Sequence, residues 1–225
     1  METLIPGMRW LHIAAGTLAL FVAPAAMLTA KGGRAHRRLG KLYFWSMSVT
    51  ALTAVLLALW RPTVFLALLA VFSFYMAFAG YRSLFHKRPD RGDRATPLDW
   101  TAATITMAAS VGMVVQGVSA SVTVRQPLGL VPIVFGVLGV VLAGKDLLAF
   151  SRPPSDPTAW WFNHMSGMLG SYIAAVTAFS VVNFTFLPTA VRWLWPTALG
   201  VPLIVFWITY YRVHLRRGQP LLTPG

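Results

Sequence analysis

Cysteine is absent from the 225 residues of this chain, and acidic side chains are scarce. Without a thiol there can be no disulfide, no thiol nucleophile and no zinc–thiolate site. Only 6 residues are Asp or Glu, and charged residues make up 11% of the chain, against 56% for hydrophobic residues. So little polar material cannot cover a soluble domain of this length. The composition therefore favours a membrane protein.

Long apolar runs fill nearly the whole sequence, and seven of them are long enough to cross a bilayer. A helix needs about 20 mostly apolar residues to cross a hydrocarbon core roughly 30 Å thick, and all of its backbone polar groups must pair within the bundle. We therefore predict an all-α, polytopic transmembrane helix bundle that forms a single domain over residues 1–225. The predicted helices cover residues 8–28, 42–60, 64–81, 100–118, 128–148, 160–182 and 193–211.

Basic residues are distributed unequally between the two sides of these predicted helices. One side holds only Arg9, Arg61, Arg125 and Arg192, out of 19 Lys and Arg residues in total. The other side holds Lys31, Arg34, Arg37, Arg38, Lys41, Arg82, Lys87, Arg88, Arg91, Arg94, Lys145, Arg152, Arg212, Arg216 and Arg217. Because short basic loops stay in the cytoplasm, we expect the N-terminus outside and the C-terminus inside. The net charge of +13 is spread over separate short loops, which argues against nucleic acid as a partner.

Three titratable residues lie at the cytoplasmic ends of predicted helices. His36 precedes the second helix, Asp146 ends the fifth, and His164 begins the sixth. Asp146 and His164 also each end a stripe of small residues, which lets helices approach closely in lipid. Because ionisable groups in membranes tend to face the bundle interior, these three side chains could converge. Two imidazoles and a carboxylate would suit a divalent metal such as zinc or non-haem iron.

A b-type haem is the alternative cofactor at the same place. His36 and His164 would be its two axial ligands, and Arg37, Arg38 and Lys41 would lie near its propionates. This version does not need Asp146. Either cofactor would serve redox chemistry or electron transfer, with a quinone as one candidate partner.

Simpler interpretations exist for each of these residues. A His or Asp at the membrane interface often caps a helix or pairs with a nearby base, and Asp146 could neutralise Lys145 or Arg152. In the absence of another His on the outer side, His12 is expected to take a hydrogen-bonded packing role, although it stays a candidate site residue. His86 lies in a basic loop and is expected to be solvated.

Two segments carry a resemblance to a known family. The first runs from His12 to Tyr43 and contains His36-Arg37-x-x-Gly40-x-x-Tyr43, the most specific element. The second begins with His164-Met165 and continues through the stretch 171–179. Together they resemble the predicted bacterial membrane proteins grouped as domain of unknown function 2306. The resemblance implies a multi-pass protein of the bacterial inner membrane and draws attention to the three histidines without assigning them a role.

Three classes of function stay open at this point. A redox or metal protein would use the cytoplasmic histidines. A small-molecule transporter or channel would need a path through the bundle, and the chain shows no inverted repeat. A non-catalytic scaffold or sensor requires no particular residue. Enzymatic activity is neither indicated nor excluded by the sequence.

Overall fold

A computed structural model describes residues 4–60, 63–88, 92–123 and 129–217. Over these residues the chain forms seven α-helices, a single 3-10 turn and no strand. The elements are α1 (Leu4–Leu28), α2 (Arg34–Trp60), α3 (Val64–Arg82), η1 (Ser83–Phe85), α4 (Pro97–Thr123), α5 (Leu130–Ser151), α6 (Ala159–Asn183) and α7 (Thr189–Arg216). All seven helices are long and apolar enough to span a membrane, which confirms the predicted all-helical fold. The described residues do not include the predicted start of the fifth helix, Leu128. They also leave out three arginines of the charge count, Arg61, Arg91 and Arg125.

Most of the helices are longer than the apolar runs that predicted them. Helix α2 begins at Arg34, well before the predicted start at Leu42, so His36 lies in its first turn and does not precede it. Helix α7 continues to Arg216, past the predicted end at Tyr211. An apolar run reports the thickness of the hydrocarbon, whereas helical hydrogen bonds also form among the polar residues that flank it.

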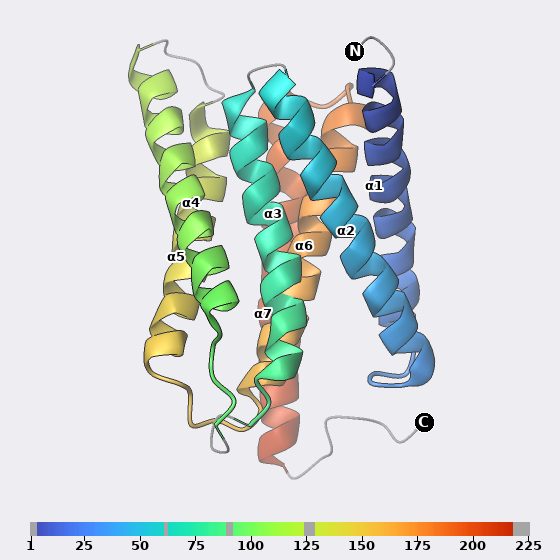
Figure 1. The fold of residues 1–225 in the computed structure, drawn as a ribbon, viewed down its shortest axis with the longest axis vertical. Coiled ribbons are helices and arrows are strands. Elements are labelled where there is room, and N and C mark those ends of the chain that lie inside the picture. The colour runs from blue at the N-terminus through green and yellow to red at the C-terminus, as the bar shows by residue number, and fades with distance from the viewer. Residues whose placement is uncertain (1–3, 61–62, 89–91, 124–128, 218–225) are drawn as a thin grey trace.

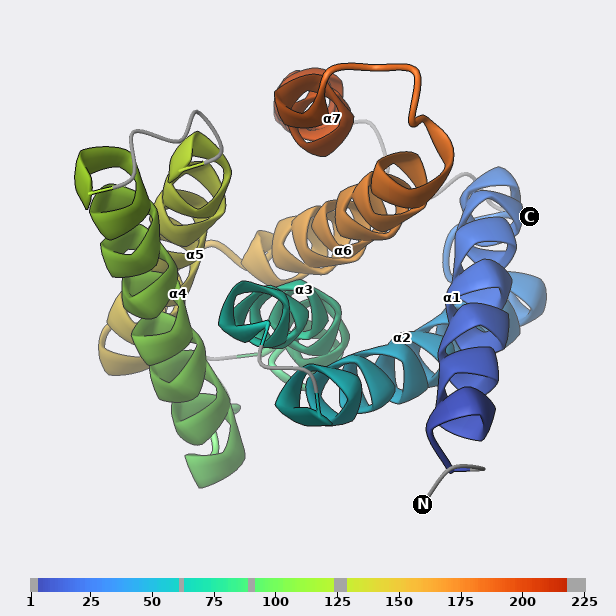
Figure 2. The ribbon, with the colours of Figure 1, turned by 90° about the horizontal axis from the view of Figure 1, so that it is seen from above.

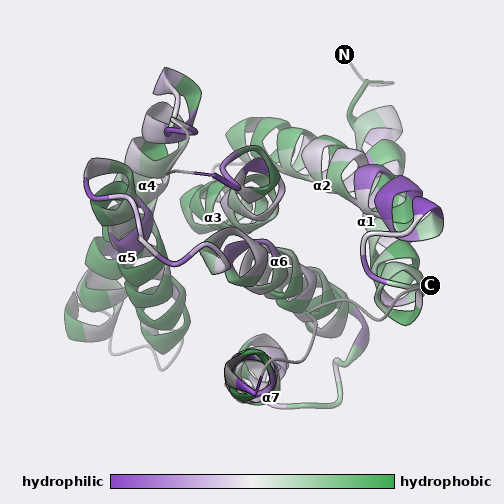
Figure 3. Cartoon of the chain, turned by 90° about the horizontal axis from the view of Figure 1, so that it is seen from below, coloured by the Kyte–Doolittle hydropathy of each residue, from purple (hydrophilic) through white to green (hydrophobic). Residues whose placement is uncertain are grey.

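The helices run up and down between two ends of the molecule, with the connection from α1 to α2 and the end of α7 at the lower end (Figure 1). Seen from above, α3 and α6 occupy the centre, α1 and α2 lie on one side, α4 and α5 on the other, and α7 lies outermost against α6 (Figure 2). Seen from below, hydrophilic residues gather at the start of α2 and in the connections beside α5 and α6 (Figure 3).

Two glycines let the central helices α3 and α6 touch through their backbones. A Cβ atom placed on Gly167 would lie 2.7 Å from the Cα atom of Gly80, and one on Gly80 would lie 2.9 Å from the backbone nitrogen of Met168. Close approach through small residues is how helices gain packing energy in lipid. This crossing holds the bundle together at the level of His164.

Apolar side chains cover most of the outer surface, as expected for contact with lipid. Phe21 and Val182 are each about 70% exposed, and α7 contributes almost no buried residue. The main buried cluster lies where α1, α2, α3 and α6 meet, and consists of Ala19, Val22, Ala23, Tyr43, Met47 and Ala77. The Tyr43 hydroxyl in this cluster hydrogen-bonds Ser171 of α6 at 2.7 Å.

Candidate functional site

His36 and His164 lie close together at the lower end of the bundle. Their ring centroids are 6.4 Å apart and the ring planes are nearly perpendicular, at 74°. His36 is in the first turn of α2, and His164 is in the second turn of α6. Both side chains are partly buried. The helix ends thus bring together two imidazoles that are far apart in the sequence.

Backbone carbonyls fix the tautomer of both imidazoles. Nδ1 of His164 lies 2.8 Å from the carbonyl oxygen of Gly80, and Nδ1 of His36 lies 3.0 Å from that of Ala26. A carbonyl can only accept, so each Nδ1 carries the hydrogen and donates it. Each neutral ring therefore keeps its lone pair on Nε2. Histidines that bind metals are commonly held by such a bond from the other ring nitrogen.

Asp146 does not join the two histidines. Its Oδ2 atom accepts a 2.7 Å hydrogen bond from the Tyr75 hydroxyl, on the other side of the central helices. Among the described residues, no three His, Asp or Glu side chains lie close enough together to hold a metal ion. The predicted set of His36, His164 and Asp146 is therefore not assembled. The hydrogen-bond partner of Asp146 is thus a tyrosine, while the neighbouring Lys145 interacts with it through charge, as the simpler prediction expected.

The surroundings of the two imidazoles fit a porphyrin poorly. One turn deeper, Leu39 and Met168 pack against the main buried cluster, together with Met27 at the end of α1. A haem between the two rings would have to displace this packing. Arg37, Arg38 and Lys41, which the haem version places near propionates, are exposed.

His12, the remaining candidate, lies apart from this pair near the other end of α1. Its Nδ1 atom lies 3.0 Å from the carbonyl oxygen of Thr50 and 3.0 Å from the Thr53 hydroxyl. These contacts join α1 to α2, as a packing role requires. The hydrogen-bonding partners belong to the neighbouring helix of the same hairpin.

A cavity of about 360 Å³ lies between α3, α5, α6 and α7 and extends to the connections at the lower end. Its walls are mostly apolar, with Phe72, Met76, Leu138, Leu142, Ile173, Ala174, Val201 and Ile204 among the residues that line it. Val141 of α5 and Val205 of α7 line it as well, yet they are 60% and 56% exposed. The cavity therefore also opens sideways, between α5 and α7, toward the surrounding lipid.

A few polar groups lie within these apolar walls. Tyr75 and Asp146 form their hydrogen-bonded pair there, contributed by α3 and α5. On α7, the buried Thr197 hydroxyl has no hydrogen-bond partner among the described residues. Buried polar groups are nearly always paired, so this hydroxyl lacks the partner that a buried polar group usually has.

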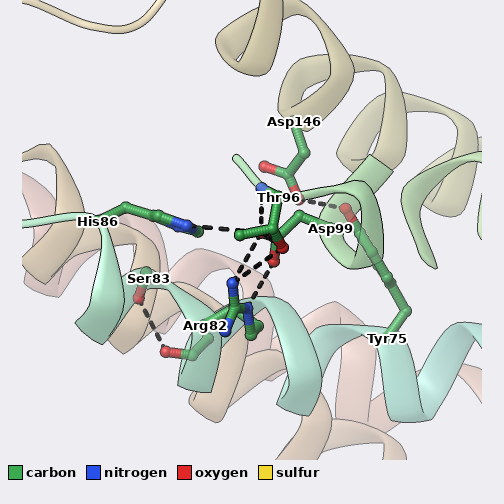
Figure 4. A network of polar contacts seen from close by, with 8 residues as sticks. Tyr75, Arg82, Ser83, His86, Thr96, Asp99 and Asp146 are labelled. Carbon is green, nitrogen blue, oxygen red and sulfur yellow. Dashed lines mark hydrogen bonds and ion pairs between the residues drawn. The ribbon is translucent and has the colours of Figure 1, made fainter. Parts of the chain in front are cut away.

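Asp99 forms the centre of a polar network at the lower mouth of the cavity (Figure 4). It is 2% exposed and accepts hydrogen bonds from Arg82 of α3, at 2.6 and 2.8 Å. It also accepts bonds from the backbone nitrogen and the hydroxyl of Thr96, both at 2.7 Å. This network fastens the start of α4 to the end of α3.

His86 belongs to this network, so the prediction that it is solvated is wrong. Its Nε2 atom lies 3.5 Å from a carboxylate oxygen of Asp99. Burial lowers the pKa of the imidazole, and the nearby Arg82 lowers it further, while Asp99 and Asp93 act in the opposite direction. The imidazole therefore tends to be neutral at physiological pH, beside a carboxylate that Arg82 already neutralises.

Comparisons with protein-family models, with curated proteins and with solved structures found no match for this chain.

Proposed function

We propose that this integral membrane protein binds a small amphipathic molecule in the cavity between α3, α5, α6 and α7, as a small-molecule transporter does. The observation that carries the proposal is the cavity. Its volume of about 360 Å³ lies within the range of roughly 300–1,000 Å³ typical of ligand sites, which are mostly apolar with few polar groups. An ionisable residue inside a membrane bundle is also a general mark of a substrate path, and Asp146 is such a residue.

The chemistry of the walls defines the class of ligand. Apolar walls and a lateral opening between α5 and α7 suit a molecule with an apolar body that enters from the bilayer. The pair of Tyr75 and Asp146 offers a polar point in the wall, and the unpaired Thr197 hydroxyl lies just behind it in a residue that lines the cavity. A quinone or another lipid-soluble molecule with one polar head group meets both requirements.

Redox chemistry at His36 and His164 has less support as the function. A porphyrin there would displace packed side chains, and the third predicted ligand, Asp146, is bonded elsewhere. We also propose that the chain belongs to the proteins grouped as domain of unknown function 2306 and lies in a bacterial inner membrane. That proposal rests on the sequence elements around His36 and His164 and on the charge bias of the loops.

Two neighbouring alanines on α6 allow a test of the cavity. Ala174 lines the cavity beside one buried cluster, whereas Ala175 is turned about 100° around the helix and packs against the main buried cluster. Because the chain contains no cysteine, Ala174→Cys and Ala175→Cys would each place a single thiol at the same membrane depth. The Ala174→Cys variant should react with N-ethylmaleimide in native membranes. The Ala175→Cys variant should react only after denaturation, because a thiolate forms only in contact with water.

The closest control for surface reactivity is Phe179→Cys, because Phe179 is 43% exposed on the same helix and does not share the helix face of Ala174. A thiol facing lipid should react slowly, because a thiolate is not stabilised in hydrocarbon. Equal protection of positions 174 and 175 would mean that the cavity is closed, and the proposal would fail.

A further inference from the structure

We propose that His36 and His164 bind one monovalent copper ion from opposite sides, with the thioethers of Met27 and Met168 as weaker donors beside it. The site lies on α1, α2 and α6, and none of its four residues lines the cavity, so this inference does not depend on the proposed function. The argument starts from the two imidazoles. Both present a lone pair on Nε2, because backbone carbonyls hold the hydrogen on Nδ1.

The separation of the rings indicates how a shared metal would be coordinated. With a metal–nitrogen distance of about 2.0 Å and roughly 1.1 Å from nitrogen to ring centre, two imidazoles on opposite sides of one ion have centroids about 6.2 Å apart. At a tetrahedral angle the same distances give about 5.1 Å. The observed 6.4 Å is close to the separation expected for two imidazoles on opposite sides of one ion, and it exceeds the tetrahedral value. Linear coordination by few ligands suits a closed-shell monovalent copper ion, whereas structural zinc prefers a tetrahedron of four ligands.

Thioethers lie at the same end of the bundle. Met27 follows Ala26, whose carbonyl holds His36, and Met168 lies one turn along α6 from His164. Both methionines pack against the same buried cluster, which itself contains Met47. Soft thioether sulfur selects monovalent copper over hard ions, and imidazole binds it as well. The available donors are thus nitrogen and soft sulfur.

Charge also argues for a monovalent ion. Helices α1, α2 and α6 contain no Asp or Glu, so hard divalent ions find no carboxylate there. The start of α2 carries Arg34, Arg37 and Arg38. Because Coulomb energy is proportional to the charge of the ion, a divalent metal would meet twice the repulsion from these guanidinium groups that a monovalent one does.

The test uses asparagine in place of each histidine. The side-chain amide of His36→Asn or His164→Asn can still donate to the backbone carbonyl, as Nδ1 does, but offers nothing at the position of Nε2. Purified protein under reducing conditions competes with the coloured copper(I) chelator bicinchoninate, and copper transfer is read from the loss of the chelate's absorbance. We expect one equivalent bound by the wild type and an affinity at least about 10-fold weaker in each variant. Met168→Leu should also weaken binding.

His12→Asn is the matched control. His12 is also a helical histidine with Nδ1 beside a backbone carbonyl, that of Thr50, but it lies apart from the other imidazoles. This variant should bind copper as the wild type does, and all four variants should keep the wild-type melting temperature within a few degrees. Failure of the wild type to take copper from the chelator would overturn the proposal, as would unchanged affinity in both His36→Asn and His164→Asn. A Soret band lost in both variants would show that the pair binds haem instead.

Discussion

Arg82 and Asp99 join α3 to the start of α4 through a two-pronged ion pair. Nε of Arg82 lies 2.6 Å from one carboxylate oxygen of Asp99, and Nη2 lies 2.8 Å from the other. Asp99 is almost fully buried, while Arg82 is 20% exposed. The loss of stability should therefore depend on which of the two partners is removed. This asymmetry leads to a first prediction.

Removing the arginine should destabilise the fold more than removing the acid. Arg82→Met leaves a buried carboxylate held by Thr96 and by the longer contact with His86, whereas Asp99→Asn leaves a guanidinium that can turn toward water. Breaking a buried pair from one side costs up to about 3–5 kcal/mol, and partial exposure of Arg82 lowers that figure. Thermal unfolding in detergent, with the double variant completing the cycle, measures both effects. Equal losses in the two single variants would contradict the assignment.

The glycine crossing of α3 and α6 should not tolerate a methyl group. A Cβ on Gly167 would lie 2.7 Å from the backbone of Gly80, so Gly167→Ala must push the two helices apart. Overpacking of this kind costs about 1–3 kcal/mol. Gly40→Ala is the control, because a Cβ atom at Gly40 meets nothing within 4 Å, and alanine favours a helix over glycine by about 1 kcal/mol. A drop in melting temperature for Gly167→Ala alone would confirm the crossing.

Much of this fold follows from the sequence, because lipid imposes strict length and polarity requirements on every spanning segment. The position of each apolar run was enough to predict seven helices, although not where their polar first and last turns begin and end. The proximity of His36 to His164 followed from placing both at one membrane depth. The membrane depth of a residue does not determine the direction of its side chain, however. Asp146 lies at the same depth as the two histidines, but its side chain bonds Tyr75 and lines the cavity.

The polar network around Asp99 shows which signals were missed. Thr96-Pro97-Leu98-Asp99 has the spacing of a helix N-terminal capping box with proline in the first turn, and the structure shows Thr96 bonded to Asp99. The contacts of Asp99 with Arg82 and His86 depend on how the loop returns to α4. No local pattern in the sequence encodes that return.

Acidification should weaken the fold through His86. Burial lowers its pKa in the folded protein below the ordinary value of about 6.5, so the unfolded chain takes up the proton first. The contribution of this residue to stability is therefore complete above about pH 6.5 and is lost as the pH falls toward the folded pKa. We expect His86→Gln to show a smaller fall in melting temperature than the wild type between pH 8 and pH 5. A steeper fall in the melting temperature of the variant than of the wild type would contradict this prediction.

The charge bias predicts a cytoplasmic C-terminus. The basic start of α2 and the end of α7 lie at the same lower end of the bundle (Figure 1), and short basic segments stay in the cytoplasm. A reporter active only in the cytoplasm, fused after Gly225, should therefore be active. Activity of a reporter that works only outside the cytoplasm would invert the orientation and place the cavity mouth on the outer side.

Native mass spectrometry of the protein released from lipid nanodiscs tests the central claim most directly. The wild type should carry a bound small molecule that Ala174→Phe loses, because the larger side chain fills part of the 360 Å³ cavity. Val182→Phe changes a position that is 72% exposed on the same helix and should keep the molecule. A wild-type protein without any bound molecule, or an Ala174→Phe variant that retains the molecule in full, would contradict the proposal that the cavity is the binding site.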